Sequence, residues 1–228
     1  MKRLEYTGKL FTIHKETDEY IKIQKHIKEV DVICEISNVF NDNLLPDTGI
    51  NILDHFIWTF AWGLNMSIGC KVVCGKYRSE HTISEDLGIT LGAGLKKFFY
   101  KKIEKTGINI CGHSIFGLDE ALVRVMVNFE GRRNCFVTCS DECSGGKTEF
   151  VEDTQAANFI AFFEGFSQGF PATIHIDLLQ GRDPHHTWES SFMALGEALR
   201  MSYSDNPWKI ARHNPFYADE GTADASLI

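Results

Sequence analysis

Long apolar stretches are absent from this 228-residue sequence. No run approaches the roughly 20 residues that span a bilayer, so no transmembrane helix is predicted. The first residues, Met1–Tyr6, turn polar at once, which argues against a signal peptide. An excess of positive charge is also lacking, because 23 Lys and Arg stand against 31 Asp and Glu, a net charge of −8. We therefore expect a cytoplasmic protein whose main partner is neither nucleic acid nor membrane.

Cysteine pairs of the Cys-x-x-Cys type are lacking too. The sequence has seven Cys, an odd number, which favours reduced thiols that pack as small apolar groups. Cys135, Cys139 and Cys143 recur every four residues, and a thiolate metal cluster at these three is the alternative. The surrounding pattern is one of strand and loop, which argues against a zinc knuckle.

Apolar residues, by contrast, are plentiful. They make up 43% of the sequence and include 17 Phe, so a sizeable buried core is expected. The length fits one large domain or two small halves that share a core. No Pro- or Ser-rich linker separates two halves, which favours the shared core.

Hydrophobic periodicity predicts alternating strands and helices. Strands are expected at 10–13, 20–23, 30–37, 67–73, 121–129, 135–139 and 173–178, and helices at 51–62, about 84–104, 154–168 and about 186–203. The strands 121–129 and 135–139 are expected to pair with each other. This order predicts an α+β fold with two pseudo-symmetric halves, each a sheet packed against helices.

A metal-binding pattern lies at the start of the last predicted helix. His185 and Glu189 are four residues apart, so they share one face of a helix, and His186 points in a neighbouring direction. Two imidazoles and a carboxylate at this spacing are typical ligands of first-row metal ions. The alternative is a solvated His pair at a helix start.

The same spacing occurs earlier in the chain. A shift of 104 positions places His185 on His81 and Glu189 on Glu85, and the flanking residues follow without a gap. Such internal similarity indicates a duplication that creates a pseudo-symmetric pair of metal sites.

These motifs, taken together and in order, resemble the imidazoleglycerol-phosphate dehydratase family. The segments that carry the resemblance are Lys28-Glu29-Val30, Thr48–His55, His81–Gly92, Leu118–Leu122, Glu130-Gly131-Arg132, Ile174-His175-Ile176 and His185–Glu189. The resemblance covers about residues 28–203. It implies a duplicated domain at 28–203 with halves of about 28–112 and 113–203, an N-terminal extension at 1–27 and a C-terminal arm at 204–228.

The resemblance implies a metal-dependent hydro-lyase that binds one or two Mn²⁺ ions, or another divalent first-row metal, and assembles into a large homo-oligomer built from trimers. The metal ligands that it implies are His55, His81, Glu85, His175, His185, His186 and Glu189.

Other residues receive catalytic or binding roles from the same resemblance. It assigns catalytic roles to Glu29, Glu85 and Glu189, with Glu29 as the acid/base that moves protons. Glu29, Asp119 and Arg132 are the expected substrate contacts. Glu16, in Lys15-Glu16-Thr17, is the alternative to Glu29 and requires a sizeable insertion.

Several positions depart from the family pattern. Thr82 replaces the second His of the first pair, so we expect one tight site at His81, Glu85 and His186 and a weak or absent one at His185 and Glu189.

The expected phosphate contacts also change. Ile110 and Met193 stand where the family has Arg and Lys, and Asp219-Glu220-Gly221 replaces Ser-Lys-Gly. Phosphate binding needs cationic donors, so weak or no binding of imidazoleglycerol phosphate is expected.

Three functions remain open on this basis. The first is a dehydratase that acts on a small azole-type substrate without the phosphate. The second is a true imidazoleglycerol-phosphate dehydratase of histidine biosynthesis. The third is a non-catalytic metal-binding or structural assembly protein.

Overall fold

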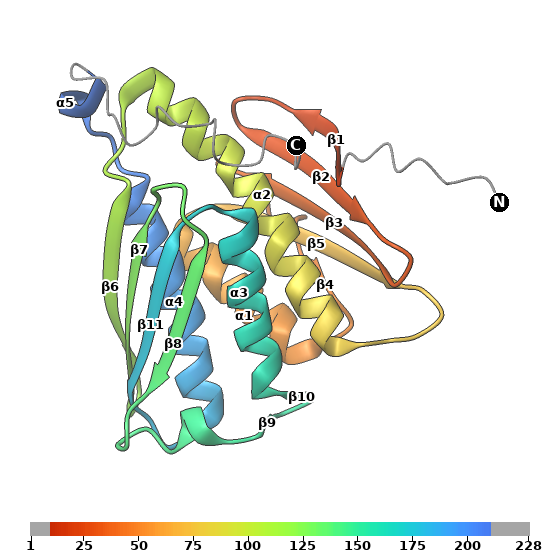
Figure 1. The fold of residues 1–228 in the computed structure, drawn as a ribbon, viewed down its shortest axis with the longest axis vertical. Helices are drawn as coiled ribbons and strands as arrows, with labels where there is room; N and C mark the ends of the chain where they lie inside the picture. The colour runs from red at the N-terminus through yellow and green to blue at the C-terminus, as the bar shows by residue number, and fades with distance from the viewer. Residues whose placement is uncertain (1–9, 211–228) are drawn as a thin grey trace.

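Two β-sheets enclose four long helices in the computed structural model, which describes residues 10–210 (Figure 1). Helices α1 (Asn51–Leu64) and α2 (Glu80–Thr106) pack on the first sheet, and α3 (Ala156–Gly169) and α4 (Pro184–Ser202) pack on the second. The helices meet in the middle, where α1 contacts α4 and α2 contacts α3. The predicted α+β fold is confirmed.

The first sheet has the strand order β1-β2-β3-β5-β4. Its strands are β1 (Phe11–Glu16), β2 (Tyr20–His26), β3 (Val30–Ser37), β5 (Ser67–Cys74) and the short β4 (Pro46–Asp47). Neighbours are antiparallel, except that β4 runs parallel to β5. Strands β1 and β2, which the sequence analysis places in an N-terminal extension, belong to this sheet and bury Phe11, Ile21 and Ile23 in the core.

The second sheet has the order β6-β7-β11-β8. Its strands are β6 (Cys111–Leu118), β7 (Ala121–Asn128), β11 (Thr173–Gln180) and β8 (Asn134–Cys139). The predicted pairing of 121–129 with 135–139 is wrong, because β11 lies between β7 and β8. Strands β7 and β11 are fully buried on one face, whereas β8 alternates between half-buried and exposed, which suits an edge strand.

The predicted helices are all present, and their N-terminal caps explain where two of them begin. Helix α2 starts four residues earlier than predicted, because the hydroxyl of Ser79 accepts a hydrogen bond from the Thr82 N–H. Helix α4 starts at Pro184, and the carboxylate of Asp183 accepts from the His185 N–H. The remaining short elements are η1 (Gly145–Lys147), β9 (Phe150–Val151), β10 (Thr154–Gln155) and α5 (Pro207–Ile210).

Glycines bring the paired helices close together. A Cβ added at Gly92 of α2 would lie 2.6 Å from the Phe166 carbonyl oxygen of α3, and one at Gly196 of α4 would meet the Phe60 carbonyl oxygen of α1. Gly92 and Gly196 are 104 positions apart, the same shift that relates the two His-x-x-x-Glu motifs. The same close helix contact is therefore made twice, as an internally duplicated fold requires.

The core between the sheets is rich in Phe, as the composition predicts. Its largest buried side chains include Phe56, Phe159, Phe192 and Trp188, whose rings pack against one another at tilted or edge-to-face angles. All seven Cys are unpaired, and Cys34, Cys70 and Cys143 are buried. Over residues 10–210, no helix has the length and apolar character needed to cross a membrane.

Candidate metal centre

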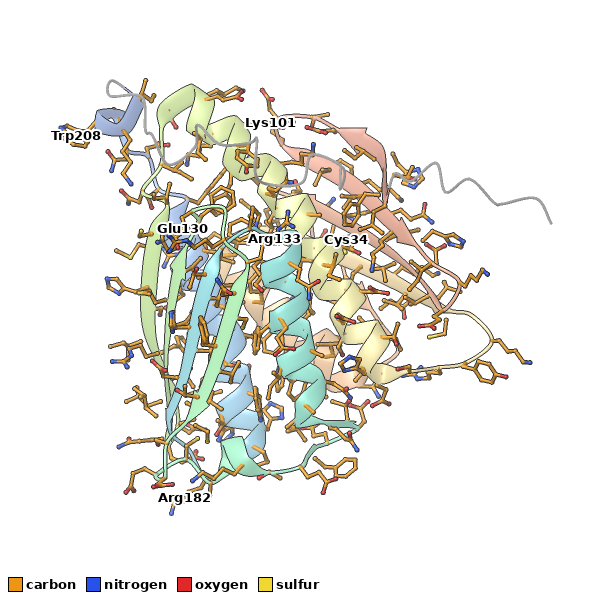
Figure 2. All side chains as sticks on the ribbon, viewed as in Figure 1. Cys34, Lys101, Glu130, Arg133, Arg182 and Trp208 are labelled. Carbon is orange, nitrogen blue, oxygen red and sulfur yellow. The ribbon has the colours of Figure 1, made fainter. Side chains whose placement is uncertain are left out.

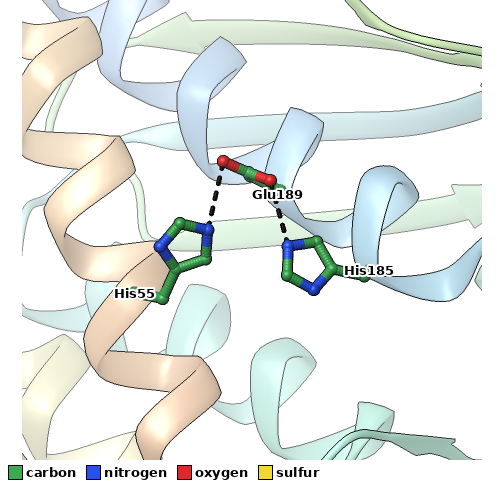
Figure 3. A group of neighbouring side chains, drawn as sticks. All are labelled: His55, His185 and Glu189. Carbon is green, nitrogen blue, oxygen red and sulfur yellow. Dashed lines mark ion pairs between the residues drawn. The ribbon is translucent and has the colours of Figure 1, made fainter.

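Three of the predicted ligands gather at the interface of α1 and α4 (Figure 3). His55, His185 and Glu189 each offer one ligand atom, and these atoms all lie within 4.8 Å of one another. Glu189 is the shared partner, with Oε1 3.3 Å from His55 Nε2 and Oε2 3.2 Å from His185 Nε2. The side chains are half-buried, so a small ligand can reach them from solvent.

The two helices hold this cluster in place. His185 and Glu189 are one turn apart at the start of α4, so both face α1. His55 comes from the second turn of α1, whose first turn is anchored because Asp153 accepts hydrogen bonds from the backbone N–H groups of Asn51 and Ile52.

Carboxylates outside the cluster orient the imidazoles of α4. Glu152 Oε1 lies 2.6 Å from His185 Nδ1, and Glu120 Oε2 lies 3.0 Å from His186 Nδ1. A carboxylate that accepts from Nδ1 fixes the ring and leaves Nε2 as the electron-pair donor, an arrangement typical of metal-binding His. The third ligand, Glu189, has a partner as well: the hydroxyl of Thr59 donates a hydrogen bond to its Oε1, at 3.3 Å.

Glu120 and His186 each stabilise the charged form of the other. Hydrogen bonds from the Asp183 backbone N–H, the His186 ring and the Arg182 N–H lower the pKa of Glu120 to about 2. The pKa of His186 is raised, chiefly by its hydrogen bond with Glu120. Glu120 is therefore an anion over the physiological pH range.

The donor set at the cluster suits a divalent first-row cation. Two imidazole nitrogens and a carboxylate are the ligands that Zn²⁺, Mn²⁺ and Fe²⁺ share, so the metal identity is not fixed by these residues. Three protein ligands leave coordination positions open for a substrate. The cluster can therefore hold a metal ion that also contacts a small molecule.

The first His-x-x-x-Glu motif gains no third ligand from the part of the chain that the structure describes. His81 Nε2 lies 3.9 Å from Glu85 Oε2 at the exposed start of α2. The expected third ligand, His186, instead lies 3.6 Å from Asp119 and 3.0 Å from Glu120. Among residues 10–210, the site that the sequence analysis expects to be tight is thus not assembled, whereas the other one gains His55.

Pseudo-symmetry explains the difference between the two motifs. The 104-residue shift places Phe159 of α3 on His55 of α1, so α3 presents a phenyl ring where α1 presents an imidazole. Phe159 is fully buried and packs on Phe56 and Trp188. The His81 pair therefore receives no imidazole from the helix that packs against it.

His175 lies apart from the cluster, on the outer face of the second sheet. Its ring stacks on Phe136 of β8 with the centroids 4.9 Å apart. It lines a cavity of about 420 Å³ with His113, Arg124 and Asp177. A metal ion bound by His175 would therefore lie on this outer face of the second sheet.

The predicted acid/base Glu29 lies in the exposed turn between β2 and β3. It lines a cavity of about 280 Å³ together with Tyr77 and Thr82, so it is near the start of α2 and not in the His55 cluster. The alternative, Glu16, forms an ion pair with Lys101 of α2, 2.8 Å away.

The predicted substrate contacts are also separate from each other. Asp119 lies in the β6–β7 turn with a left-handed backbone (φ 49°), next to His186. The Arg132 side chain is 75% exposed, and its guanidinium is 3.7 Å from Glu130. Sequence reasoning did not identify Glu120 and Glu152, although Glu120 adjoins Asp119 in a motif that had been singled out.

The expected phosphate region has one cation that the sequence did not suggest. Ile110 is buried and adopts φ 64°, an unusual conformation for a β-branched residue. Lys209 of α5 donates to the Asn109 carbonyl, so an ammonium group lies beside this loop. Residues 219–221 lie outside the described part of the chain.

Comparison with known proteins identifies the scaffold. The sequence model of the family described as imidazoleglycerol-phosphate dehydratase matches residues 48–199. An imidazoleglycerol-phosphate dehydratase of Hahella chejuensis is 31% identical over 186 residues, which is 82% of this chain and 90% of that protein. One of Pseudomonas paraeruginosa is 39% identical over 160 residues, 68% of this chain and 75% of that protein.

Solved structures agree with the sequence matches. The Pyrococcus furiosus enzyme, crystallised in complex with (S)-C348, aligns with a TM-score of 0.66 and 29% identity over 80% of this chain and 94% of its own. The Staphylococcus aureus subsp. aureus N315 enzyme gives a TM-score of 0.66 and 26% identity over 80% and 98%. Motifs, fold and matched length therefore agree, and the chain belongs to the imidazoleglycerol-phosphate dehydratase family, whose members are hydro-lyases.

Proposed function

We propose that the protein removes water from imidazoleglycerol phosphate in a reaction that depends on a divalent metal ion, with Mn²⁺ as the expected ion, and so serves histidine biosynthesis. The observation that carries the proposal is the His55, His185 and Glu189 cluster on this family's scaffold. An imidazole-bearing substrate suits a metal site with open coordination positions, because its ring nitrogens are themselves metal ligands.

Some residues of the chain would bind the metal ion, and others would orient these ligands. When bound, a divalent cation would act as a Lewis acid toward the substrate ring and stabilise negative charge that develops there. His55, His185 and Glu189 would hold the cation, and Glu152 and Thr59 would keep two of these ligands oriented.

Loss of water requires that a proton and a hydroxyl both leave the substrate. A carboxylate that accepts one proton and delivers another can serve both steps. Glu29 is our candidate for this acid/base, with Glu85 and Glu189 contributing to catalysis and Asp119 and Arg132 to substrate binding.

We further propose that subunit association, in an oligomer built from trimers, completes the centre. His81, Glu85, His175 and His186 lie at surfaces that the His55 cluster does not reach within one chain. Ligands on the start of α2 and on the outer sheet face can meet only if two chains pack together. The soluble, cytoplasmic location expected from the sequence is compatible with such an assembly.

A different substrate is the second candidate. Ile110 and Met193 replace cationic residues of the family, which favours a small azole alcohol without a phosphate group. The relatives described above all carry the imidazoleglycerol-phosphate dehydratase name, and Lys209 supplies a cation beside the 107–112 loop, so the phosphorylated substrate is the better supported one.

The test compares imidazoleglycerol phosphate with imidazoleglycerol as substrates for metal-stripped and Mn²⁺-reconstituted protein. We expect turnover of the phosphorylated substrate only after reconstitution, and its loss in His55→Asn. His26→Asn is the matched control, since His26 is an exposed residue of β2. Faster turnover of imidazoleglycerol would establish the second candidate, and absence of turnover with both would refute the proposed reaction.

A further inference from the structure

A further cavity lies apart from the metal cluster, between the first sheet and helices α2 and α3. Its volume is about 320 Å³, which is in the size range of small-molecule sites. It adjoins Gln168 and Gly169 at the end of α3, whereas the cluster lies near the start of α4. Figure 2 shows Arg133 near the middle of the molecule, beside the end of α3, and Arg182 at the bottom of the view, just before α4.

Much of the wall of this cavity is apolar. It consists of residues from α2, β2 and β1 with the residue before it, namely Leu10, Phe11, Ile13, Ile23, Ile89 and Ala93. Ile13 is 37% exposed although it belongs to a sheet that packs its neighbours into the core. An apolar group that enters the cavity would cover this surface, and the removal of apolar area from water favours binding.

Cations also line the cavity. Among residues 10–210, the lining includes Lys96, Lys97 and Arg133 and no carboxylate, although the protein carries a net charge of −8. A cation near the last turn of α3 is expected from the helix dipole alone. That explanation does not account for Arg133, which lines the cavity and has no ion pair among residues 10–210.

Nε of Arg133 is shielded from solvent, so an anion in the cavity would be bound by the terminal NH₂ groups of the guanidinium. Lys97, one residue beyond Lys96 on α2, would add a second charge to the same ligand, and no ion pair of Lys97 is found within the described chain. Both cations line a cavity whose other lining side chains are mainly hydrocarbon. The ligand that fits has an anionic head and a compact apolar body.

We propose that this cavity binds a small amphipathic anion, an acyl or aryl compound with a carboxylate or phosphate head, at a site separate from the metal centre. Arg133 and Lys97 hold the head, and the β1, β2 and α2 side chains enclose the apolar body. The proposal does not depend on which substrate the metal centre uses.

The test is isothermal titration calorimetry of the full-length, metal-stripped protein with octanoate, octyl phosphate, 1-octanol and octylammonium. Metal removal prevents the head groups from binding as metal ligands. We expect both anions to bind, octanol to bind at least about tenfold more weakly, and octylammonium not to bind. The tighter of the two anions identifies the head group.

Variants then locate the site. Arg133→Gln and Lys97→Gln should each weaken octanoate binding about tenfold or more, whereas Arg133→Lys, which keeps the charge, should stay within about threefold of the parent. Lys71→Gln is the charge-matched control, because Lys71 is an exposed residue of β5 that does not line the cavity. Far-ultraviolet circular dichroism verifies that each variant is folded.

Three outcomes would overturn the proposal. One is that the parent binds neither anion at millimolar concentration. Another is that octanol binds as tightly as octanoate, which would leave the cations without a role. The third is that Arg133→Gln and Lys97→Gln both bind octanoate like the parent, which would place the anion elsewhere on the protein. Because Lys97 is a helix-surface residue, Lys97→Gln remains informative if Arg133→Gln does not fold.

Discussion

At the scale of single residues, carboxylates outside the candidate cluster contact the imidazoles at the start of α4. Glu152 contacts His185 Nδ1 from the turn between β9 and β10, where its own backbone is left-handed (φ 50°). Glu120 contacts His186 Nδ1 from the turn between β6 and β7. Each turn therefore places a carboxylate against an imidazole of α4, and each contact is testable by removing a single charge.

Glu152→Gln should weaken binding of Mn²⁺ by about 10- to 100-fold, because an amide is a poorer acceptor for the His185 N–H and leaves the ring less well oriented. Calorimetric titration of metal-stripped protein with MnCl₂ measures this change without reference to activity. Glu149→Gln serves as the control on an exposed carboxylate nearby. An unchanged affinity in Glu152→Gln would mean that the contact does not orient His185.

At the scale of elements, the stability of the fold depends on how its helices begin and on how closely they cross. The two N–H groups at the start of α1 are satisfied from outside the helix, by Asp153. The crossings are close because glycines replace side chains where the backbones meet. Each of these features leads to a prediction about stability.

Asp153→Ala should lower the free energy of unfolding by about 1 kcal/mol at pH 7, since it leaves N–H groups of α1 without acceptors. Burial raises the pKa of Asp153, but the hydrogen bonds from Asn51 and Ile52 outweigh it, so the pKa is lowered from 3.8. The carboxylate thus stabilises the fold above pH 3.8 and loses this effect as the pH falls through its folded-state pKa.

Urea denaturation at several pH values measures the effect of Asp153→Ala, and the difference from the parent protein should shrink below pH 3.8. Asp42→Ala, at an exposed loop position, is the control. A difference that persists undiminished at low pH would show that the loss comes from packing and not from the charged cap.

Gly92→Ala should destabilise the protein by about 1–3 kcal/mol or more, because the added Cβ would lie 2.6 Å from the Phe166 carbonyl oxygen and force α2 and α3 apart. Gly117→Ala is the matched control, since its Cβ would meet the Ala121 carbonyl oxygen at an ordinary 3.5 Å. Chemical denaturation measures the free energy of unfolding of both variants. Equal stability of the two variants would contradict a tight crossing at Gly92.

The elements also show which features local sequence can predict. The strand β3 and the helix α1 have clear periodicity and were predicted nearly to the residue. The strand β6 was missed, because Gly112 and His113 interrupt its apolar alternation, and Gly112 is needed where α4 packs on the strand. The position of β11 between β7 and β8 depends on contacts between segments far apart in the sequence, which no local sequence pattern can predict.

At the scale of the whole molecule, the duplication places two helix pairs back to back, and among residues 10–210 a three-residue ligand cluster forms at only one of them. The sequence repeat predicted two equivalent His-x-x-x-Glu motifs, and both lie at helix starts. It did not predict that His55 would join His185 across the α1–α4 contact, because that depends on which helices pair. Nor could spacing alone predict the carboxylates behind the imidazoles, which come from distant turns.

Divalent metal should stabilise the folded chain, because His55 and His185 come together only in the native state. Saturating Mn²⁺ at about 100 times its dissociation constant would add roughly 2.7 kcal/mol to the free energy of unfolding. A thermal melt with and without a chelator measures this, and His55→Asn should abolish the shift while His26→Asn keeps it. A shift that survives in His55→Asn would place the stabilising metal at another site.

The pairing of α1 with α4 also sets an order of events during synthesis. Thr59 and Glu189 are in contact although 130 positions separate them in the chain. At translation rates of about 5–20 residues per second, α1 waits roughly 7–26 s for its partner helix to be made. Its apolar face must be shielded during that time by the first sheet or by a chaperone. Metal capture at this cluster would then be among the last steps of biogenesis, and a chain truncated before α4 would be unable to retain the ion there.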